Sequence, residues 1–135
     1  MQDSIFTKII TREIPAHIIY EDAYTIVIPD IMPTMRGQLL VIPKKQATYA
    51  FALEDTEYHA LMETTKRIAQ ACDRAFNTVR TCIVIEGFEV PHVHVRLYPC
   101  TTPTLVWEPR YTASAQELEE VSASVQRALA QNRIT

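Results

Sequence analysis

Two of the four histidines in this 135-residue chain stand two residues apart, in an alternating run at residues 91–99 (PHVHVRLYP). In a β-strand, His92, His94 and Arg96 would lie on one face and the intervening valines on the other, because successive side chains alternate. Side chains on one face recur about every 7 Å. Two imidazoles and a guanidinium in such a row could bind a phosphate group, and a neutral imidazole could attack its phosphorus.

A pair of histidines on a strand has two other common uses. They can be half-buried structural residues, or they can supply two ligands to zinc, copper or iron. A metal site needs further ligands, but His17 and His59 lie on other segments without ligand spacing. Arg96, next in the row, would also repel a cation. From the residues alone all three uses stay open, and metal binding is the least favoured.

Charge and composition narrow the classes of partner. The formal net charge of -3 argues against a nucleic-acid polymer or an anionic membrane. There is no signal-peptide pattern and no apolar run long enough to span a bilayer, so we expect a cytoplasmic protein with no membrane partner. Three widely spaced cysteines are typical of free thiols in a reducing compartment. The length predicts one domain over residues 1–135.

Hydrophobic periodicity predicts both strands and helices. Short β-branched runs predict strands at 17–20, 25–29, 39–43, 82–86 and 92–98, with a short extended piece at 104–107. Glu21-Asp22 is a candidate hairpin turn. Helical spacing begins near Glu54 and ends at Phe76, with Asp55 as the N-cap. A capping box at 114–117 opens a second helix over about 114–131. The pattern predicts an α+β fold, an antiparallel sheet with a long helix packed on it and a C-terminal helix.

The run at 91–97 resembles the His-φ-His-φ-His-φ-φ signature of the histidine triad (HIT) family of nucleotide hydrolases and transferases. Residues 5–15, 19–22 and 30–44 resemble further family segments in the right order, so the likeness covers about 5–99. The resemblance implies a HIT-like fold, a homodimer and no cofactor. It also implies hydrolysis or transfer at the α-phosphate of a purine nucleotide derivative, a phosphoramidate or a dinucleoside polyphosphate.

The resemblance also assigns roles to individual residues. His94 matches the nucleophile that carries a covalent nucleotidyl group, and the backbone carbonyl of His92 would orient its other nitrogen. Asp30 would hold the ribose hydroxyls, although an Asp in this place is also typical of a turn. The positions that would enclose the base are Ile5, Phe6, Ile9, Ile28 and Ile31. Taken without the family, such aliphatic residues are equally typical of a core.

The chain departs from the family pattern at its third triad position, where Arg96 replaces histidine. Arginine stays charged and cannot exchange protons, but it binds phosphate oxygens well. Relatives in the uridylyltransferase branch carry glutamine there, so a third histidine is dispensable for the covalent step. The alternative is that Arg96 blocks turnover and leaves an inactive nucleotide-binding module. Gln38 likewise stands where the family often has a histidine.

The loop before the signature is shorter than the family's phosphate loop. Backbone N–H groups at 87–90, including that of Val90, could bind phosphate. Glu89 would then lie near an anion, so it either acts as a general acid with a raised pKa or turns outward, and the outward orientation is favoured. Some relatives bind zinc through cysteines near the start; here Ser4 and Thr7 lie in that region, so no metal is expected.

Overall fold

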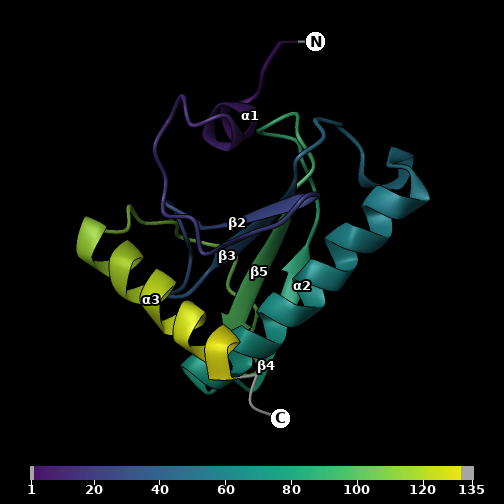
Figure 1. The fold of residues 1–135 in the computed structure, drawn as a ribbon. Helices are drawn as coiled ribbons and strands as arrows, with labels where there is room; N and C mark the ends of the chain where they lie inside the picture. The colour runs from purple at the N-terminus through teal and green to yellow at the C-terminus, as the bar shows by residue number, and fades with distance from the viewer. Residues whose placement is uncertain (1, 132–135) are drawn as a thin grey trace.

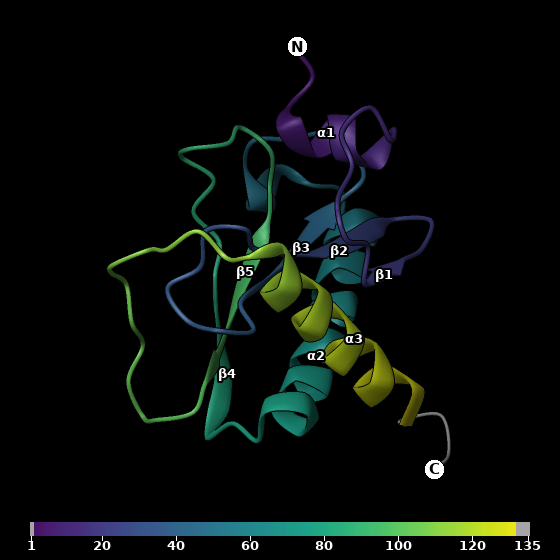
Figure 2. The ribbon, with the colours of Figure 1, turned by 90° about the vertical axis from the view of Figure 1, so that its left-hand side faces the viewer.

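The computed structural model describes residues 2–131 as three helices and five strands (Figures 1 and 2). The helices are α1 (Ile5–Ile10), α2 (Asp55–Phe76) and α3 (Ala115–Gln131), with a 3-10 turn at Ala50–Ala52. The strands are β1 (Tyr20–Glu21), β2 (Thr25–Pro29), β3 (Leu39–Pro43), β4 (Arg80–Val84) and β5 (Val95–Cys100). They form one antiparallel sheet in the order β1-β2-β3-β5-β4. The predicted α+β fold is confirmed.

Both faces of the central strands are buried. On one face, Val27, Val41 and Leu97 pack with Leu61 and other residues of α2 and α3. On the opposite face, α1 covers a second cluster made of Phe6, Ile9, Ile26, Ile28, Leu40 and Ile42. Each fully buried aliphatic side chain contributes roughly 1.5–3 kcal/mol. The double covering explains why β2 and β3 are apolar throughout instead of alternating with polar residues.

Helix α2 has the predicted bounds but a different cap. Glu54 occupies the N-cap position without a side-chain hydrogen bond, and Asp55 is the first helical residue. The prediction that Asp55 caps the helix is therefore wrong. Its carboxylate still lies in the first turn, where it complements the helix dipole. The helix ends at Phe76, and its C-cap residue Asn77 has a φ of 51°, the left-handed conformation common at helix C-termini.

Several strand boundaries differ from the prediction. The first turn lies one residue later than expected, because the carboxylate of Asp22 accepts hydrogen bonds from the N–H groups of Tyr24 (2.9 Å) and Thr25 (2.8 Å). Strand β1 covers Tyr20–Glu21 instead of 17–20, strand β4 begins and ends two residues earlier than predicted, and residues 104–107 form no strand. The last strand starts at Val95, so His92 and His94 precede the ladder instead of belonging to it.

The loop between β2 and β3 is held against the end of α2. Gly37 has a φ of +92°, and a Cβ at this position would lie 2.8 Å from the Phe76 ring. Only glycine fits both the backbone conformation and this contact. The loop is thereby fixed beside Asp30 and Gln38, two of the residues implicated from the sequence.

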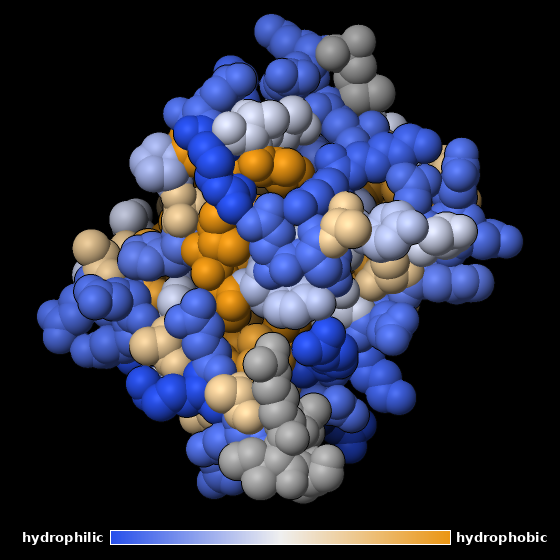
Figure 3. Space-filling model, in the orientation of Figure 1, coloured by the Kyte–Doolittle hydropathy of each residue, from blue (hydrophilic) through white to orange (hydrophobic). Residues whose placement is uncertain are grey.

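The surface is predominantly hydrophilic on the side drawn in Figure 3, with hydrophobic residues reaching it mainly as a band through the middle of the view. Among the helices of residues 2–131, none is both long and apolar enough to cross a membrane.

Candidate active site

His94 lies directly before β5, and one of its ring nitrogens is fixed by a hydrogen bond. Its Nδ1 is 2.7 Å from the backbone carbonyl of His92. Because a carbonyl only accepts, Nδ1 carries the hydrogen and Nε2 keeps its lone pair in the neutral ring. The residue is 2% exposed. Nε2 has no hydrogen bond within residues 2–131. Only Glu86 Oε1 and Arg96 Nε are both enclosed and without a hydrogen bond in this range, so His94 Nε2 is in contact with solvent.

Burial and charge keep the His94 imidazole neutral. Burial is the largest cause that lowers its pKa, and the cationic Arg96 lowers it further. The hydrogen bond to the His92 carbonyl and the carboxylates of Glu86 and Asp30 act in the opposite direction. The net pKa lies below the ordinary value of 6.5. A neutral ring with a free Nε2 is the nucleophilic form of histidine.

His92 is held through both of its ring nitrogens. Its Nε2 donates to the carbonyl of Pro43 at 2.8 Å, and its Nδ1 lies 2.7 Å from the hydroxyl oxygen of Ser4. Ser4 is the N-cap of α1, and Gln46 accepts hydrogen bonds from the Ser4 N–H (3.0 Å) and the Thr7 hydroxyl (2.6 Å). His92 is fully buried, and burial lowers its pKa. This network fixes the residue whose carbonyl orients His94.

The aromatic ring of Phe6 packs edge-on against both histidines. The ring centroids are 5.0 Å apart for His94 and 5.8 Å apart for His92. Helix α1 thus supplies one wall of the site through Phe6 and a hydrogen-bonding residue through Ser4. This helix was not among the elements predicted from periodicity, since six residues are too few for a helical repeat to be recognised.

Asp30 lies at the centre of a second polar cluster. Its Oδ2 accepts a hydrogen bond from Gln38 Nε2 at 2.7 Å and lies 3.5 Å from Arg96 Nε, while Oδ1 accepts from the N–H of Met32 at 2.9 Å. The Asp30 and Arg96 side chains are 10% and 13% exposed. Gln38 also accepts from the N–H of Thr34 at 2.9 Å. The structure therefore brings Asp30, Gln38 and Arg96 together.

The aliphatic residues assigned to the base fall into two groups. Phe6, Ile9 and Ile28 belong to the buried cluster under α1, with Val90 packed at its edge. Ile5 and Ile31 lie outside it and are 47% and 61% exposed. The first group is part of the core as well as a wall near the histidines, whereas the second is free to contact a ligand.

Glu89 lies at the surface, although His94 and Arg96 both act on the pKa of its carboxylate. Its carboxylate is 62% exposed and pairs with Arg110 at 3.1 Å. The hydrogen bond from Arg110 is the largest cause that lowers the pKa of Glu89, which is the opposite of what a general acid needs. These contacts favour the outward orientation expected from the sequence.

Glu86 is a residue that the sequence did not single out. Its Oε2 accepts a hydrogen bond from the N–H of Phe88 at 3.0 Å. Its Oε1 is enclosed and has no hydrogen bond within the described range, and Arg96 Nε is likewise enclosed without a hydrogen bond. No local sequence pattern marks Glu86; it lies two residues beyond the last pair of the β4–β5 ladder, Val84 with Arg96, and its carboxylate raises the pKa of His94.

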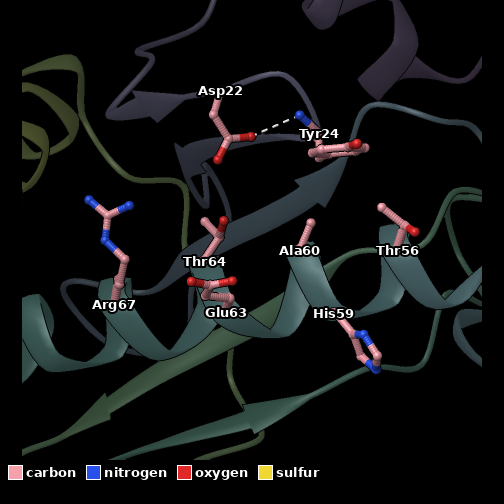
Figure 4. Close-up of a pocket in the computed structure, with 8 residues that line it drawn as sticks. All are labelled: Asp22, Tyr24, Thr56, His59, Ala60, Glu63, Thr64 and Arg67. Atoms are coloured by element: carbon pink, nitrogen blue, oxygen red, sulfur yellow. Dashed lines mark hydrogen bonds between the residues drawn. The ribbon is translucent and has the colours of Figure 1, made fainter.

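A separate hollow of about 450 Å³ lies between α2 and the turn that joins β1 to β2 (Figure 4). It is lined by Asp22, Tyr24, Thr56, His59, Ala60, Glu63, Thr64 and Arg67. None of these eight residues belongs to the predicted site. The Asp22 carboxylate already accepts a hydrogen bond from the Tyr24 N–H in the turn, and Arg67 donates to the Tyr20 hydroxyl at 3.1 Å. The hollow therefore does not compete with the histidines as the candidate site.

No group of three or more His, Cys, Asp or Glu side chains suited to a metal ion occurs among residues 2–131. Ser4 and Thr7, which lie where some relatives have cysteines, bond to His92 and Gln46 instead.

Comparisons with known proteins converge on one family. The HIT domain matches residues 11–100. The adenosine 5′-monophosphoramidase of Schizosaccharomyces pombe is 30% identical over 129 residues, which cover 90% of this chain and 97% of that protein. An uncharacterized HIT-like protein of Methanocaldococcus jannaschii is 33% identical over 99 residues, 70% of this chain and 77% of its own. The crystal structure of a HIT-like protein from Bartonella henselae, with unknown ligand, has a TM-score of 0.86 at 27% identity and covers 93% of this chain and 96% of that one.

Proposed function

This chain belongs to the HIT domain family, and from that premise we propose that it is a hydrolase or transferase acting at the α-phosphate of a purine nucleotide derivative. The substrate is of the phosphoramidate or dinucleoside polyphosphate type, and the reaction passes through a covalent nucleotidyl group on His94. The observation that carries the proposal is the hydrogen bond from His94 Nδ1 to the His92 carbonyl, which leaves Nε2 free to attack.

The proposed hydrolysis has two steps. In the first, His94 Nε2 forms a bond to the α-phosphorus, and the bond to the leaving group breaks with its electron pair on the leaving atom, which takes a proton from solvent if it is an amine. In the second, water attacks the same phosphorus, the bond to Nε2 breaks with its electron pair on His94, and a proton returns to solvent. The net reaction consumes one water and releases a nucleoside monophosphate.

The polar cluster supplies the remaining proposed roles. Arg96, through its guanidinium, stabilises the charge that develops on the phosphate oxygens. Asp30 receives the ribose hydroxyls, because a carboxylate has about four acceptor positions and Met32 and Gln38 fill only two of them with hydrogen bonds. Ile5 and Ile31 contact the base from their exposed positions.

Trapping the intermediate tests the proposal. The protein is incubated briefly with a nucleoside phosphoramidate labelled at the phosphorus, quenched in base, and digested for mass spectrometry. We expect the nucleotidyl group on the peptide that contains His94. Label on another residue, or hydrolysis without a labelled intermediate, would contradict the covalent route.

A second candidate function is an inactive nucleotide-binding module. The observation that favours it is the ion pair between Arg96 and Asp30, which holds the guanidinium beside the carboxylate instead of leaving it free for phosphate. This function predicts binding of a purine nucleotide by calorimetry with no product release and no label on His94.

The proposed nucleophile makes activity depend on pH in a defined direction. His94 attacks only when neutral, and its pKa is lowered, chiefly by burial, from the ordinary value of 6.5. As pH falls through the pKa of the folded protein, the ring takes up a proton and kcat/KM decreases, so the acid limb lies below pH 6.5. Arg96→Gln removes a cation that lowers this pKa, and we expect the limb to move to higher pH. Rates measured from pH 4.5 to 8 with both proteins check this; a limb unmoved by the substitution would contradict it.

The homodimer implied by the resemblance is proposed to form through β4. This strand is an edge of the sheet, and Val79 and Ile83 at this edge are exposed. An uncovered edge with apolar side chains favours pairing with a second chain, and a charge there opposes it. We expect Ile83→Glu to halve the mass measured by sedimentation, whereas Tyr24→Glu, in the turn at the other side of the sheet, leaves it unchanged. A monomeric parent protein would contradict the proposal.

A single domain over 1–135 and a cytoplasmic location are also proposed. The support for the location is that Cys72, Cys82 and Cys100 are all free thiols, as a reducing compartment predicts.

A further inference from the structure

Two enclosed side-chain atoms within residues 2–131 lack a hydrogen-bond partner, and both belong to the candidate site. One is an acceptor, Glu86 Oε1, and the other is a donor, Arg96 Nε. Enclosed polar atoms nearly always have a hydrogen bond in folded proteins, and Arg96 Nε has only its ion pair with Asp30 at 3.5 Å, so a donor and an acceptor without hydrogen bonds at one site call for an explanation. Neither atom reaches solvent in this structure, so a ligand with a complementary acceptor and donor would satisfy both after a small displacement of the side chains that enclose them.

Glu86 and the nucleophile flank the same end of the β4–β5 ladder. The ladder ends at the pair Val84 and Arg96, Glu86 follows Val84 by two residues, and His94 precedes Arg96 by two residues. Ile85 packs against the core cluster that also holds Val93 and Val95, and the neighbouring Glu86 side chain is not part of that cluster. In agreement with this placement, the Glu86 carboxylate raises the pKa of His94 while Arg96 lowers it.

The loop holds the Glu86 carboxylate by one oxygen only. Oε2 accepts from the N–H of Phe88 at 3.0 Å, across a turn made by Gly87 at a φ of +66°. This contact fixes the carboxylate and leaves Oε1 as its unused acceptor. Glu89, three residues later, has its carboxylate paired with Arg110 at the surface, and neither of its oxygens is enclosed without a hydrogen bond.

We propose that Glu86 determines the leaving group of the reaction, accepting a hydrogen bond at Oε1 from the N–H of an amine bonded to the α-phosphorus. This inference rests on the proposed function and selects the phosphoramidate class over the dinucleoside polyphosphates. An amine brings a donor to the carboxylate, whereas a phosphate leaving group brings only acceptor oxygens and a negative charge. Arg96 Nε then donates to an oxygen of the α-phosphate.

In the selected reaction, the bond from His94 Nε2 to phosphorus forms as the phosphorus–nitrogen bond breaks. The electron pair of that bond stays on the nitrogen, which takes one proton from solvent and leaves as a free amine. Glu86 gains and loses no proton in this step. Its contribution is to hold the amine in line and to reject an anionic leaving group.

The test compares kcat/KM for two substrates, an adenosine 5′-phosphoramidate of a primary amine and diadenosine triphosphate. In Glu86→Gln, the ratio of the first to the second is expected to fall about 10- to 100-fold, because a charge-assisted hydrogen bond is lost and the repulsion is relieved. Glu89→Gln is the matched control, and its ratio should stay within about 2-fold of the parent because its pair with Arg110 is exposed. Thermal melting verifies that both variants are folded.

The outcomes separate this inference from the proposed function. If the parent protein turns over substrate but Glu86→Gln leaves the ratio of the two kcat/KM values unchanged, with or without an equal loss on both substrates, the proposed role of Glu86 is wrong and the proposed function is not affected. If the parent protein turns over neither substrate and His94 stays unlabelled, the proposed function fails. The affinity of the phosphoramidate relative to ADP then decides the inference: a drop in this ratio in Glu86→Gln supports the selection, and an unchanged ratio contradicts it.

Discussion

Replacing His94 with asparagine is expected to lower turnover of a nucleoside phosphoramidate by at least about 10³-fold. The amide has no nitrogen lone pair able to attack phosphorus, so the covalent step is lost and the label found on the parent protein disappears. The side-chain N–H of asparagine can still donate to the His92 carbonyl, which accepts from Nδ1 at 2.7 Å in the parent protein. The local structure and nucleotide affinity should therefore change little.

The matched control is His59→Asn, a substitution of an exposed histidine on α2 that lies away from the triad. It should keep the full rate. Nucleotide affinity measured by calorimetry should lie within about 3-fold of the parent value in both variants, because neither change removes a group proposed to hold ribose or base. Substantial residual turnover in His94→Asn would mean that His94 is not the nucleophile, and inversion of configuration at an isotopically chiral phosphorus would then mean that water attacks directly.

Local patterns were sufficient to predict most of the fold. Helix α2 has its predicted bounds because 22 residues give several turns of helical repeat. The start of α3 follows the predicted capping box in part, since the Glu117 N–H donates to the Ser114 hydroxyl at 3.1 Å. The Glu117 carboxylate accepts instead from Tyr111 at 2.6 Å, a contact that no local pattern encodes.

The site was less predictable because its contacts join distant segments. The alternating run placed His92, His94 and Arg96 near one another, but the strand begins only at Val95. Ser4 reaches His92 across 88 positions of sequence, and Arg96 meets Asp30 across the sheet. Such pairings depend on strand order and register, which periodicity does not determine.

The contact between Asp30 and Arg96 also changes the role that the sequence suggested for Arg96. From the sequence, Arg96 was a cation available for phosphate. In the structure its Nε lies 3.5 Å from the Asp30 carboxylate and has no hydrogen bond within the described residues. A substrate would therefore have to bind both members of this pair, with ribose on the carboxylate and phosphate on the guanidinium. The pair then links the two halves of the nucleotide site.

Replacing Asp30 with alanine is expected to lower the free energy of unfolding by about 3 kcal/mol, since removing one partner leaves a mostly buried charge unpaired. Arg96 loses its counter-ion, Gln38 Nε2 loses an acceptor at 2.7 Å, and the N–H of Met32 loses one at 2.9 Å. Urea unfolding measures the change. Asp3→Ala, which removes an exposed carboxylate, is the matched control and should stay within about 0.5 kcal/mol of the parent value.

A double-variant cycle separates the ion pair from the other contacts of Asp30. With Arg96→Met as the second substitution, the unpaired cation no longer exists, so part of the loss caused by Asp30→Ala should be recovered. We expect a coupling energy of about 1–2 kcal/mol between the two positions. The coupling should change little between 0.05 and 0.5 M salt, since mostly buried pairs are poorly screened. Additive losses would mean that Arg96 has no energetic dependence on Asp30, and that Gln38 and Met32 account for the whole effect of the carboxylate.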